Sequence, residues 1–170
     1  AITMSNGVVV ATFGTNHNTG YGLGFGSGSS LSSIGTPNYH NWFVAYDTVM
    51  ENVGTNGNWQ MPTDSITGEL YSMTPAPSIY ARFTSWSVLA QDLPSFYAPT
   101  NTGSIAFQDC EFHDGKIVTY RPTINLTNCL FERVYANLAS TDGNSPYIRN
   151  NLFLGGTFNF APNITNAFVK

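Results

Sequence analysis

The sequence predicts an all-β fold, a right-handed single-stranded parallel β-helix (a β-solenoid) with coils of about 19–24 residues. An eight-residue pattern recurs in six rows that start at residues 2, 43, 81, 105, 124 and 146. Its third and eighth positions are apolar in every row, and its fifth is small and polar. Only 9% of the residues are charged, and Asn, Thr, Ser and Gly supply the polarity. Such a composition suits stacks of like side chains, because uncharged residues do not repel their copies.

The spacing within the pattern predicts two strands separated by a bend. The clearest rows are Ile105–Phe112 and Ile124–Phe131, which lie 19 residues apart. One alternating strand cannot bury both the third and the eighth positions, because their spacing is odd. A bend at the fifth position resets the alternation, and Asn and Asp tolerate the left-handed conformation that it needs. Short apolar segments then predict a third strand in each coil, at Lys116–Thr119, Ala136–Leu138 and Thr157–Phe160.

The rows define the residues expected inside the solenoid and at its bends. The predicted core columns are Met4, Val9, Met50, Phe83, Val88, Phe107, Phe112, Leu126, Phe131, Ile148 and Phe153. The predicted bend ladder is Asn6, Asp47, Ser85, Asp109, Asn128 and Asn150. We expect one β-helix domain over residues 1–170, with loop insertions, or coils too irregular for the pattern, at about 14–40 and 54–78. Neither end carries an evident polar cap, so we expect a segment of a longer chain or a subunit covered by neighbours.

The two clearest rows also carry a resemblance. Ile105-Ala-Phe-Gln-Asp-Cys-Glu-Phe112 and Ile124-Asn-Leu-Thr-Asn-Cys-Leu-Phe131 resemble the coils of right-handed β-helix proteins of the pectin-lyase-like superfamily. The nearest likeness is to large secreted β-helix proteins of environmental bacteria, and it is closer over residues 80–170 than over 1–79. The resemblance implies the fold and an extracellular or cell-surface location. It does not imply one function, because this fold carries lyases, hydrolases, tailspikes, adhesins and structural shafts.

Catalytic groups of that superfamily find only partial counterparts in this chain. Its lyases use clustered carboxylates for calcium with a nearby base, for which the acidic candidates are Asp109, Glu111, Asp114 and Glu132. Glu111 and Arg133 would lie on or near neighbouring coils, where they could simply pair. Its hydrolases use closely spaced aspartates and a His-Gly pair, which His113-Asp114-Gly115 matches only in part. No set of carboxylates that could converge on one sugar is evident. We therefore expect no catalytic residue, no metal and no cofactor.

Cys110 and Cys129 occupy the same column of consecutive coils. Neighbouring strands lie about 4.8 Å apart, which is within the Cα span of a disulfide. A buried free cysteine is an equally common core residue, so the sequence leaves both states open. Zinc is not expected, because His17, His40 and His113 are dispersed.

Charge and repeat together favour a structural role. Six basic residues are scattered over a chain of net charge −4, which argues against nucleic acid, and no apolar run is long enough for a membrane span. We expect an extracellular structural or adhesive β-solenoid, such as an adhesin or filament subunit, whose partners are further coils of its parent chain or identical subunits. One alternative is a phage or viral fibre segment. The other is a β-helix that binds or cleaves polysaccharide, with sugar-stacking candidates Tyr21, Tyr39, Trp42, Trp59, Tyr71 and Tyr97.

Overall fold

The computed structural model describes residues 1–14, 20–21, 23–45, 66–67, 75–87, 94–98, 103–119, 123–138, 146–160 and 168–169. These residues form β-strands and turns, and they contain no helix that could cross a membrane. The strands are β1 (Ile2–Met4), β2 (Val9–Gly14), β3 (Gly20–Tyr21), β4 (Leu23–Gly24), β5 (Ser30–Ile34), β6 (Asn41–Ala45), β7 (Ile66–Thr67), β8 (Ser78–Arg82), β9 (Thr84–Ser87), β10 (Pro94–Ala98), β11 (Ser104–Gln108), β12 (Glu111–His113), β13 (Lys116–Thr119), β14 (Thr123–Thr127), β15 (Leu130–Leu138), β16 (Tyr147–Arg149), β17 (Leu152–Phe160) and β18 (Phe168–Val169).

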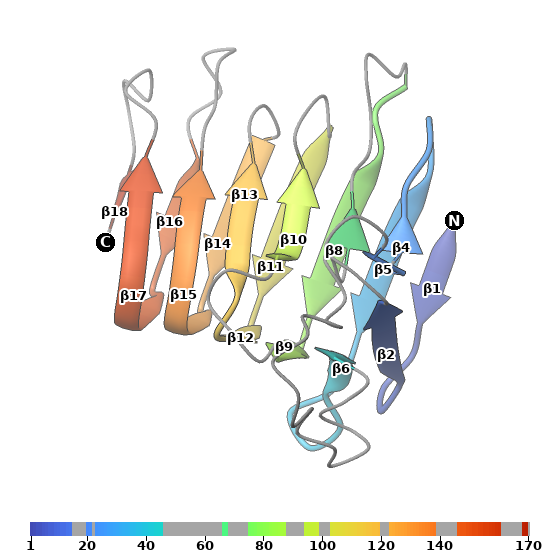
Figure 1. The fold of residues 1–170 in the computed structure, drawn as a ribbon, viewed down its shortest axis with the longest axis horizontal. Coiled ribbons are helices and arrows are strands. Elements are labelled where there is room, and N and C mark those ends of the chain that lie inside the picture. Colours follow the sequence, from blue (N-terminus) through green and yellow to red (C-terminus); the bar gives the residue numbers. More distant parts are fainter. Residues whose placement is uncertain are drawn as a thin grey trace.

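The first of two sheets contains seven parallel strands in the order β1-β5-β8-β11-β14-β16-β18. These strands lie side by side along the long axis of the molecule, from the N-terminal to the C-terminal end (Figure 1). The pairing keeps one register, so that Ile79, Ile105 and Ile124 are direct partners on β8, β11 and β14. Strands β5, β8, β11 and β14 each add a buried apolar side chain, Leu31, Ile79, Ile105 and Ile124, to a column that runs along the stack.

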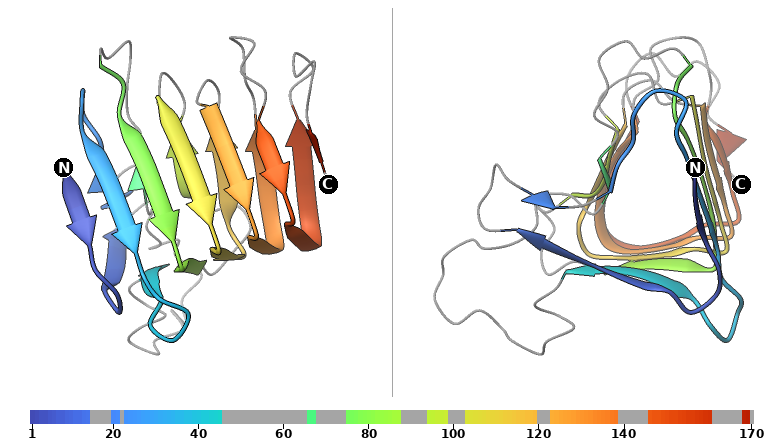
Figure 2. Two further views of the ribbon diagram at one scale, coloured as in Figure 1. Left: turned by 180° about the vertical axis from the view of Figure 1, so that it is seen from behind. Right: turned by 90° about the vertical axis from the view of Figure 1, so that its right-hand side faces the viewer.

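The second sheet contains the remaining strands and wraps round a corner. Its order is β3-β2-β6-β9-β12-β15-β13-β10-β7-β4, with β17 also paired to β15. The pairings are parallel except for the antiparallel pair β2–β3. Strands β15 and β17 are nine residues long and continue round the corner at which Asp114-Gly115 separates β12 from β13. Seen end on, the described strands follow a roughly triangular outline (Figure 2).

A stack of five aromatic rings occupies the centre of the core. The rings belong to register partners on β6, β9, β12, β15 and β17, which are Phe43, Trp86, Phe112, Phe131 and Phe153. Successive ring centroids are 5.3, 4.6, 5.0 and 5.0 Å apart, and successive ring planes differ by 8°, 5°, 2° and 11°. The stack follows from the parallel register, because like positions recur at the strand spacing, where aromatic rings attract one another.

The pattern of the C-terminal rows agrees with the structure. Asp109, Asn128 and Asn150 have φ angles of 53°, 55° and 54°, the left-handed conformation expected of the bend ladder. Their rows also bury the expected core residues, which are Phe107, Phe112, Leu126, Phe131 and Ile148, and Met4 is buried in the first row. Phe153 stacks on Phe131 but is 38% exposed, because no described strand pairs with the far edge of β17.

The row placed at residue 81 is wrong by two residues. Ile79, and not Ala81, pairs with Ile105, so Ala81 takes the third position and Trp86 the eighth. Phe83 is therefore the bend residue, with a φ of 47°, and not a core residue. Ser85 is a buried strand residue of β9 and not a bend. The error arose because an apolar Phe83 satisfies the core pattern equally well.

The first two rows also need correction. Phe43 pairs with Trp86 and therefore occupies the eighth position of its row, not the first. That row begins at Leu31, the partner of Ile79, and has an extra turn between β5 and β6. Part of the expected insertion at 14–40 is therefore a coil. In the first row Val10 is the partner of Phe43, and Val9 is 56% exposed. An additional residue at this bend puts Gly7, with a φ of 77°, in the left-handed conformation in place of Asn6. Three further predicted residues lie outside the described ranges: Asp47, Met50 and Val88.

Candidate functional site

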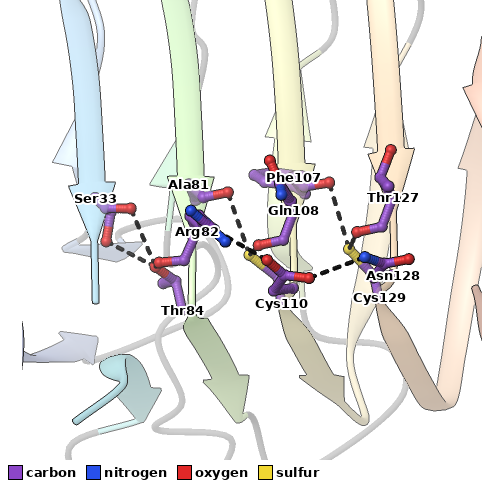
Figure 3. A network of polar contacts seen from close by, with 11 residues as sticks. Ser33, Ala81, Arg82, Thr84, Phe107, Gln108, Cys110, Thr127, Asn128 and Cys129 are labelled. Atoms are coloured by element: carbon purple, nitrogen blue, oxygen red, sulfur yellow. Dashed lines mark hydrogen bonds and ion pairs between the residues drawn. The ribbon is translucent and has the colours of Figure 1, made fainter. Parts of the chain in front are cut away.

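The residue that follows the first bend points into the stack in successive coils. These residues form what we call the inner polar column: Asn41, Thr84, Cys110, Cys129 and Asn151. Figure 3 shows Thr84, Cys110 and Cys129 at equivalent places below three neighbouring strands. All of them except the partly buried Asn151 are buried. A polar residue in such a place needs hydrogen-bond partners, because burial without them is costly.

Thr84, Cys110 and Cys129 lie within donating distance of equivalent pairs of carbonyl oxygens. One acceptor lies two residues earlier in the same coil, and the other is the third position of the preceding coil. The distances within the coil are 3.2 Å for Thr84 Oγ1–Arg82 O, 3.2 Å for Cys110 Sγ–Gln108 O and 3.3 Å for Cys129 Sγ–Thr127 O. Those to the preceding coil are 3.4 Å each, for Thr84 Oγ1–Ser33 O, Cys110 Sγ–Ala81 O and Cys129 Sγ–Phe107 O. A hydroxyl and a thiol thus occupy the same position against equivalent carbonyl oxygens, and the hydroxyl of Thr84 also lies 2.9 Å from Ser33 Oγ.

The two asparagines of the inner polar column add a contact that hydroxyl and thiol do not make. The side-chain oxygen of Asn151 accepts the backbone N–H of Cys129 at 2.8 Å, and its amide nitrogen donates to Leu126 O at 2.9 Å. Asn41 likewise accepts the backbone N–H of Val8 at 3.0 Å and donates to Ser33 Oγ at 3.0 Å. Each asparagine therefore joins two coils through its side chain, at the bend where the strand pairing is interrupted.

Cys110 and Cys129 are free thiols in the structure and are both buried. Burial raises the pKa of the Cys110 thiol well above its ordinary value, and the neighbouring Cys129 raises it further. A thiol with a raised pKa stays protonated near neutral pH, and the protonated form is a poor nucleophile. Burial and the raised pKa therefore give no support to a catalytic role for Cys110.

A small polar network covers the outside of the first bend. Arg82 Nε lies 3.0 Å from Asp109 Oδ2, and Asn128 Nδ2 donates to Asp109 Oδ1 at 3.1 Å. The Arg82 guanidinium also lies 4.8 Å from the centre of the Phe83 ring. Asp109 thus connects its own bend to those of the coils on both sides.

At the second corner, three side chains from two coils form a hydrogen-bonded cluster. His113 Nδ1 lies 2.8 Å from a carboxylate oxygen of Glu132, its register partner, and His113 Nε2 lies 3.2 Å from Glu111. A histidine ring donates from both nitrogens only in the imidazolium form, and a neutral ring donates to one of the two carboxylates. The hydrogen bond from His113, followed by that from Arg133, lowers the pKa of Glu132.

Arg133 and Asp114 form a two-pronged ion pair beside this cluster. Arg133 Nε and Nη2 each lie 2.9 Å from one oxygen of Asp114, and Arg133 Nη1 also contacts Glu132. The φ angles of Asp114 and Arg133 are 58° and 53°, and Gly155 at the equivalent place has 71°. These residues make a second bend column, which the sequence pattern had not identified. Asp114 and Arg133 have opposite charges and lie 19 residues apart, which is the offset of the two clearest rows. This spacing was a signal that could have revealed the second bend column.

The structure brings most of the candidate acidic residues together, and each of them contacts a histidine or an arginine side chain. Glu111, Asp114 and Glu132 contact His113 or Arg133, whereas Asp109 lies in the separate network of the first bend. Among the described residues, no group of three or more His, Cys, Asp or Glu side chains is placed to hold a metal ion. Of the sugar-stacking candidates, Tyr39 is exposed and Trp42 is half-buried. The other side chains lie outside the described part of the structure: Tyr21, Trp59, Tyr71 and Tyr97. His17 lies outside it too.

Comparison with protein-family models, with curated proteins and with solved structures gives no match for this chain.

Proposed function

We propose that the chain is a right-handed parallel β-helix that serves as an extracellular structural or adhesive solenoid, and that copies stack head to tail into a filament. The observation that supports this most directly is the chemistry of the two terminal strand edges. No charged residue occurs in residues 2–12 or in residues 152–160. Strand edges that must stay free are usually protected by charges, prolines or bulges, and these two edges lack such charges.

The edge at the C-terminal end is long and apolar. Strand β17 pairs with β15 on one side, and no described strand lies on the other. Leu152 and Leu154 are 62% and 57% exposed, and the ring of Phe153 ends the aromatic stack. At the N-terminal end, β1 pairs only with β5, and Val9 on β2 is exposed. Both ends therefore present unpaired backbone groups together with apolar side chains.

A second copy fits these edges better than an unrelated partner does, because the register already matches. Strands β17 and β2 belong to the same sheet and contribute to the same columns, which hold Phe153 at one end and Val10 at the other. Strand β2 pairs with β6 through residues 9–12 and with β3 through Phe13 and Gly14. A copy moved along the axis would place residues 9–12 of its β2, which precede the pairing with β3, parallel to β17 and continue the columns. Such a head-to-tail contact does not close on itself, and it therefore produces a filament and not a dimer.

The non-catalytic part of the proposal is supported by the state of the acidic residues. In the described residues, Glu111, Asp114 and Glu132 pair with His113 or Arg133. Hydrolysis of a sugar chain needs two carboxyl groups that face one bond with room for the substrate. Carboxylates in mutual ion pairs with basic side chains do not present that arrangement.

Electron microscopy and light scattering over a range of protein concentrations test the proposal. The wild-type protein is expected to form thin rods that lengthen with concentration. The Leu152→Lys/Leu154→Lys variant places two charges at the β17 edge, next to Glu132 in the register, and is expected to remain monomeric. The matched control is Thr123→Lys/Asn125→Lys, which places two charges at exposed positions of β14 in the middle of the stack and should still form rods.

Circular dichroism checks that both variants keep the wild-type strand content. A wild-type protein that stays monomeric at every concentration would refute the filament. Rods that persist in the Leu152→Lys/Leu154→Lys variant would refute the assignment of the β17 edge.

A further inference from the structure

The inner polar column places two thiols on directly neighbouring coils. The backbone N–H of Leu130 donates to Cys110 O at 2.9 Å, and Glu111 is the register partner of Leu130. The residue before each of these partners is a cysteine, so Cys110 and Cys129 occupy equivalent places on adjacent strands. Such strands lie about 4.8 Å apart, and disulfides span Cα separations of about 4.4–6.8 Å.

Hydrogen bonding alone does not require cysteine at these two places. Thr84, one coil earlier, contacts the equivalent two carbonyl oxygens with its hydroxyl at 3.2 and 3.4 Å. A hydroxyl is a stronger donor than a thiol, so threonine would serve the column at least as well. What two adjacent thiols add, and a hydroxyl cannot, is the capacity to form a covalent bond.

We propose that Cys110 and Cys129 form an intramolecular disulfide that joins two consecutive coils when the chain folds in an oxidising environment. A low-molecular-weight disulfide is the oxidant. The thiolate of one cysteine attacks it, releases one small thiol and leaves a mixed disulfide. The thiolate of the second cysteine then attacks the protein sulfur of that mixed disulfide and releases the second small thiol. The two cysteines together lose two protons and two electrons, and the small disulfide gains them.

The burial of the two thiols determines when this reaction occurs. In the folded chain, both sulfurs are shielded from solvent and lie against carbonyl oxygens. An oxidant reaches them readily only before the two coils have closed, or during their transient opening. The bond also requires both sulfurs to turn away from their carbonyl acceptors and the Cβ atoms to approach to about 3.5–4.5 Å. Oxidation is therefore expected to be fast during refolding and slow once the protein is native.

The disulfide would close a loop round one complete coil, since the two cysteines are 19 residues apart. A loop of this size restricts the unfolded chain, and for a chain of this length the expected rise in Tm is about 6–12 °C. The stabilised element is the pair of rows that carries Phe112 and Phe131, the middle of the aromatic stack.

The test compares protein refolded with oxidised glutathione and protein refolded with reduced glutathione. Free thiols are then blocked with iodoacetamide in denaturant, and the intact mass is measured. The oxidised sample is expected to show no blocked thiol, a linked peptide pair containing Cys110 and Cys129, and the higher Tm. The Cys110→Thr variant keeps the column's hydrogen bonds in the manner of Thr84, and its Tm should be the same in both buffers.

Two blocked thiols after oxidising refolding would overturn the proposal, as would a disulfide found only between chains. An intramolecular disulfide that leaves Tm unchanged would overturn the stabilising role. The mass and peptide readouts do not depend on filament formation, and Tm is compared in the Leu152→Lys/Leu154→Lys background, so this proposal and the proposed function can fail separately.

Discussion

The aromatic stack predicts a graded loss of stability along its length. Phe112 is fully buried, and its ring lies parallel to Trp86 at 4.6 Å and to Phe131 at 5.0 Å. The edge of Phe107 meets it at 5.2 Å. Phe153, by contrast, stacks on Phe131 only, is met by the edge of Phe158 at 4.4 Å and is partly exposed. Truncation to alanine should therefore cost much more at Phe112 than at Phe153.

The magnitudes follow from burial and from the ring contacts. Phe112→Ala removes a buried ring and leaves a cavity, which should lower the free energy of unfolding by about 3–5 kcal/mol. Phe112→Leu keeps most of the apolar volume but loses the two stacked pairs, at about 0.5–1.5 kcal/mol each, so the expected loss is about 1–3 kcal/mol. Phe153→Ala should cost about 1–2 kcal/mol, because its ring is already partly in water.

Urea unfolding followed by tryptophan fluorescence measures these losses, because Trp86 lies within the stack. All variants are compared in the Leu152→Lys/Leu154→Lys background and at low concentration, so that assembly cannot bury Phe153. Equal losses for Phe112→Ala and Phe153→Ala would refute the graded stack. A loss below about 1 kcal/mol at Phe112 would refute its place in the core.

Three further predictions follow from single residues. Gly156→Ala should destabilise the fold by about 2–4 kcal/mol in thermal unfolding. The φ of Gly156 is 83°, and a Cβ at this position would lie 2.2 Å from Val134 O. In the control Gly26→Ala the new Cβ meets nothing within 4 Å, so its stability should equal that of the wild type. Asn151→Ala should cost about 2–3 kcal/mol in urea unfolding, because a backbone N–H and a carbonyl lose their partner. The pKa of Glu132 is lowered in the folded state, so the ionised carboxylate stabilises the fold fully at pH values above its ordinary pKa of 4.5. This stabilisation is lost as the pH falls through the folded-state pKa. Glu132→Gln should therefore flatten the acidic part of the curve of unfolding free energy against pH.

The C-terminal rows could be predicted from sequence because their bends are occupied by residues with a local preference. Asp109, Asn128 and Asn150 tolerate positive φ and mark the bend in each of the three C-terminal rows. Phe83 has no such preference, since a bulky residue at positive φ is rare, and it is held there by the register of β8 with β11. The location of that bend is therefore decided by tertiary pairing, which an eight-residue pattern does not contain.

The candidate site shows the same division. The shared column of Cys110 and Cys129 was evident from the 19-residue offset. The equivalence of these cysteines to Thr84 and Asn151 was not evident from the sequence, because the residue types differ. The predicted row that contains Thr84 was also displaced by two residues. Pairing of Arg133 with Asp114 depends on two left-handed bends at the second corner. The apolar pattern stops before that corner and could not locate it.

The two corners of the coil are stabilised by different interactions, and this difference bears on how the surface can vary. The first corner relies on buried hydrogen bonds from the inner polar column, whose loss leaves a buried backbone group unpaired. The second relies on exposed contacts among His113, Glu132 and Arg133, and such surface pairs contribute about 0–1 kcal/mol each and are weakened by salt. Charges on the outer face can therefore change with little effect on the stack, whereas the inner polar column and the aromatic rings cannot. The stacked parallel strands therefore keep their axial register when charges on the outer face change.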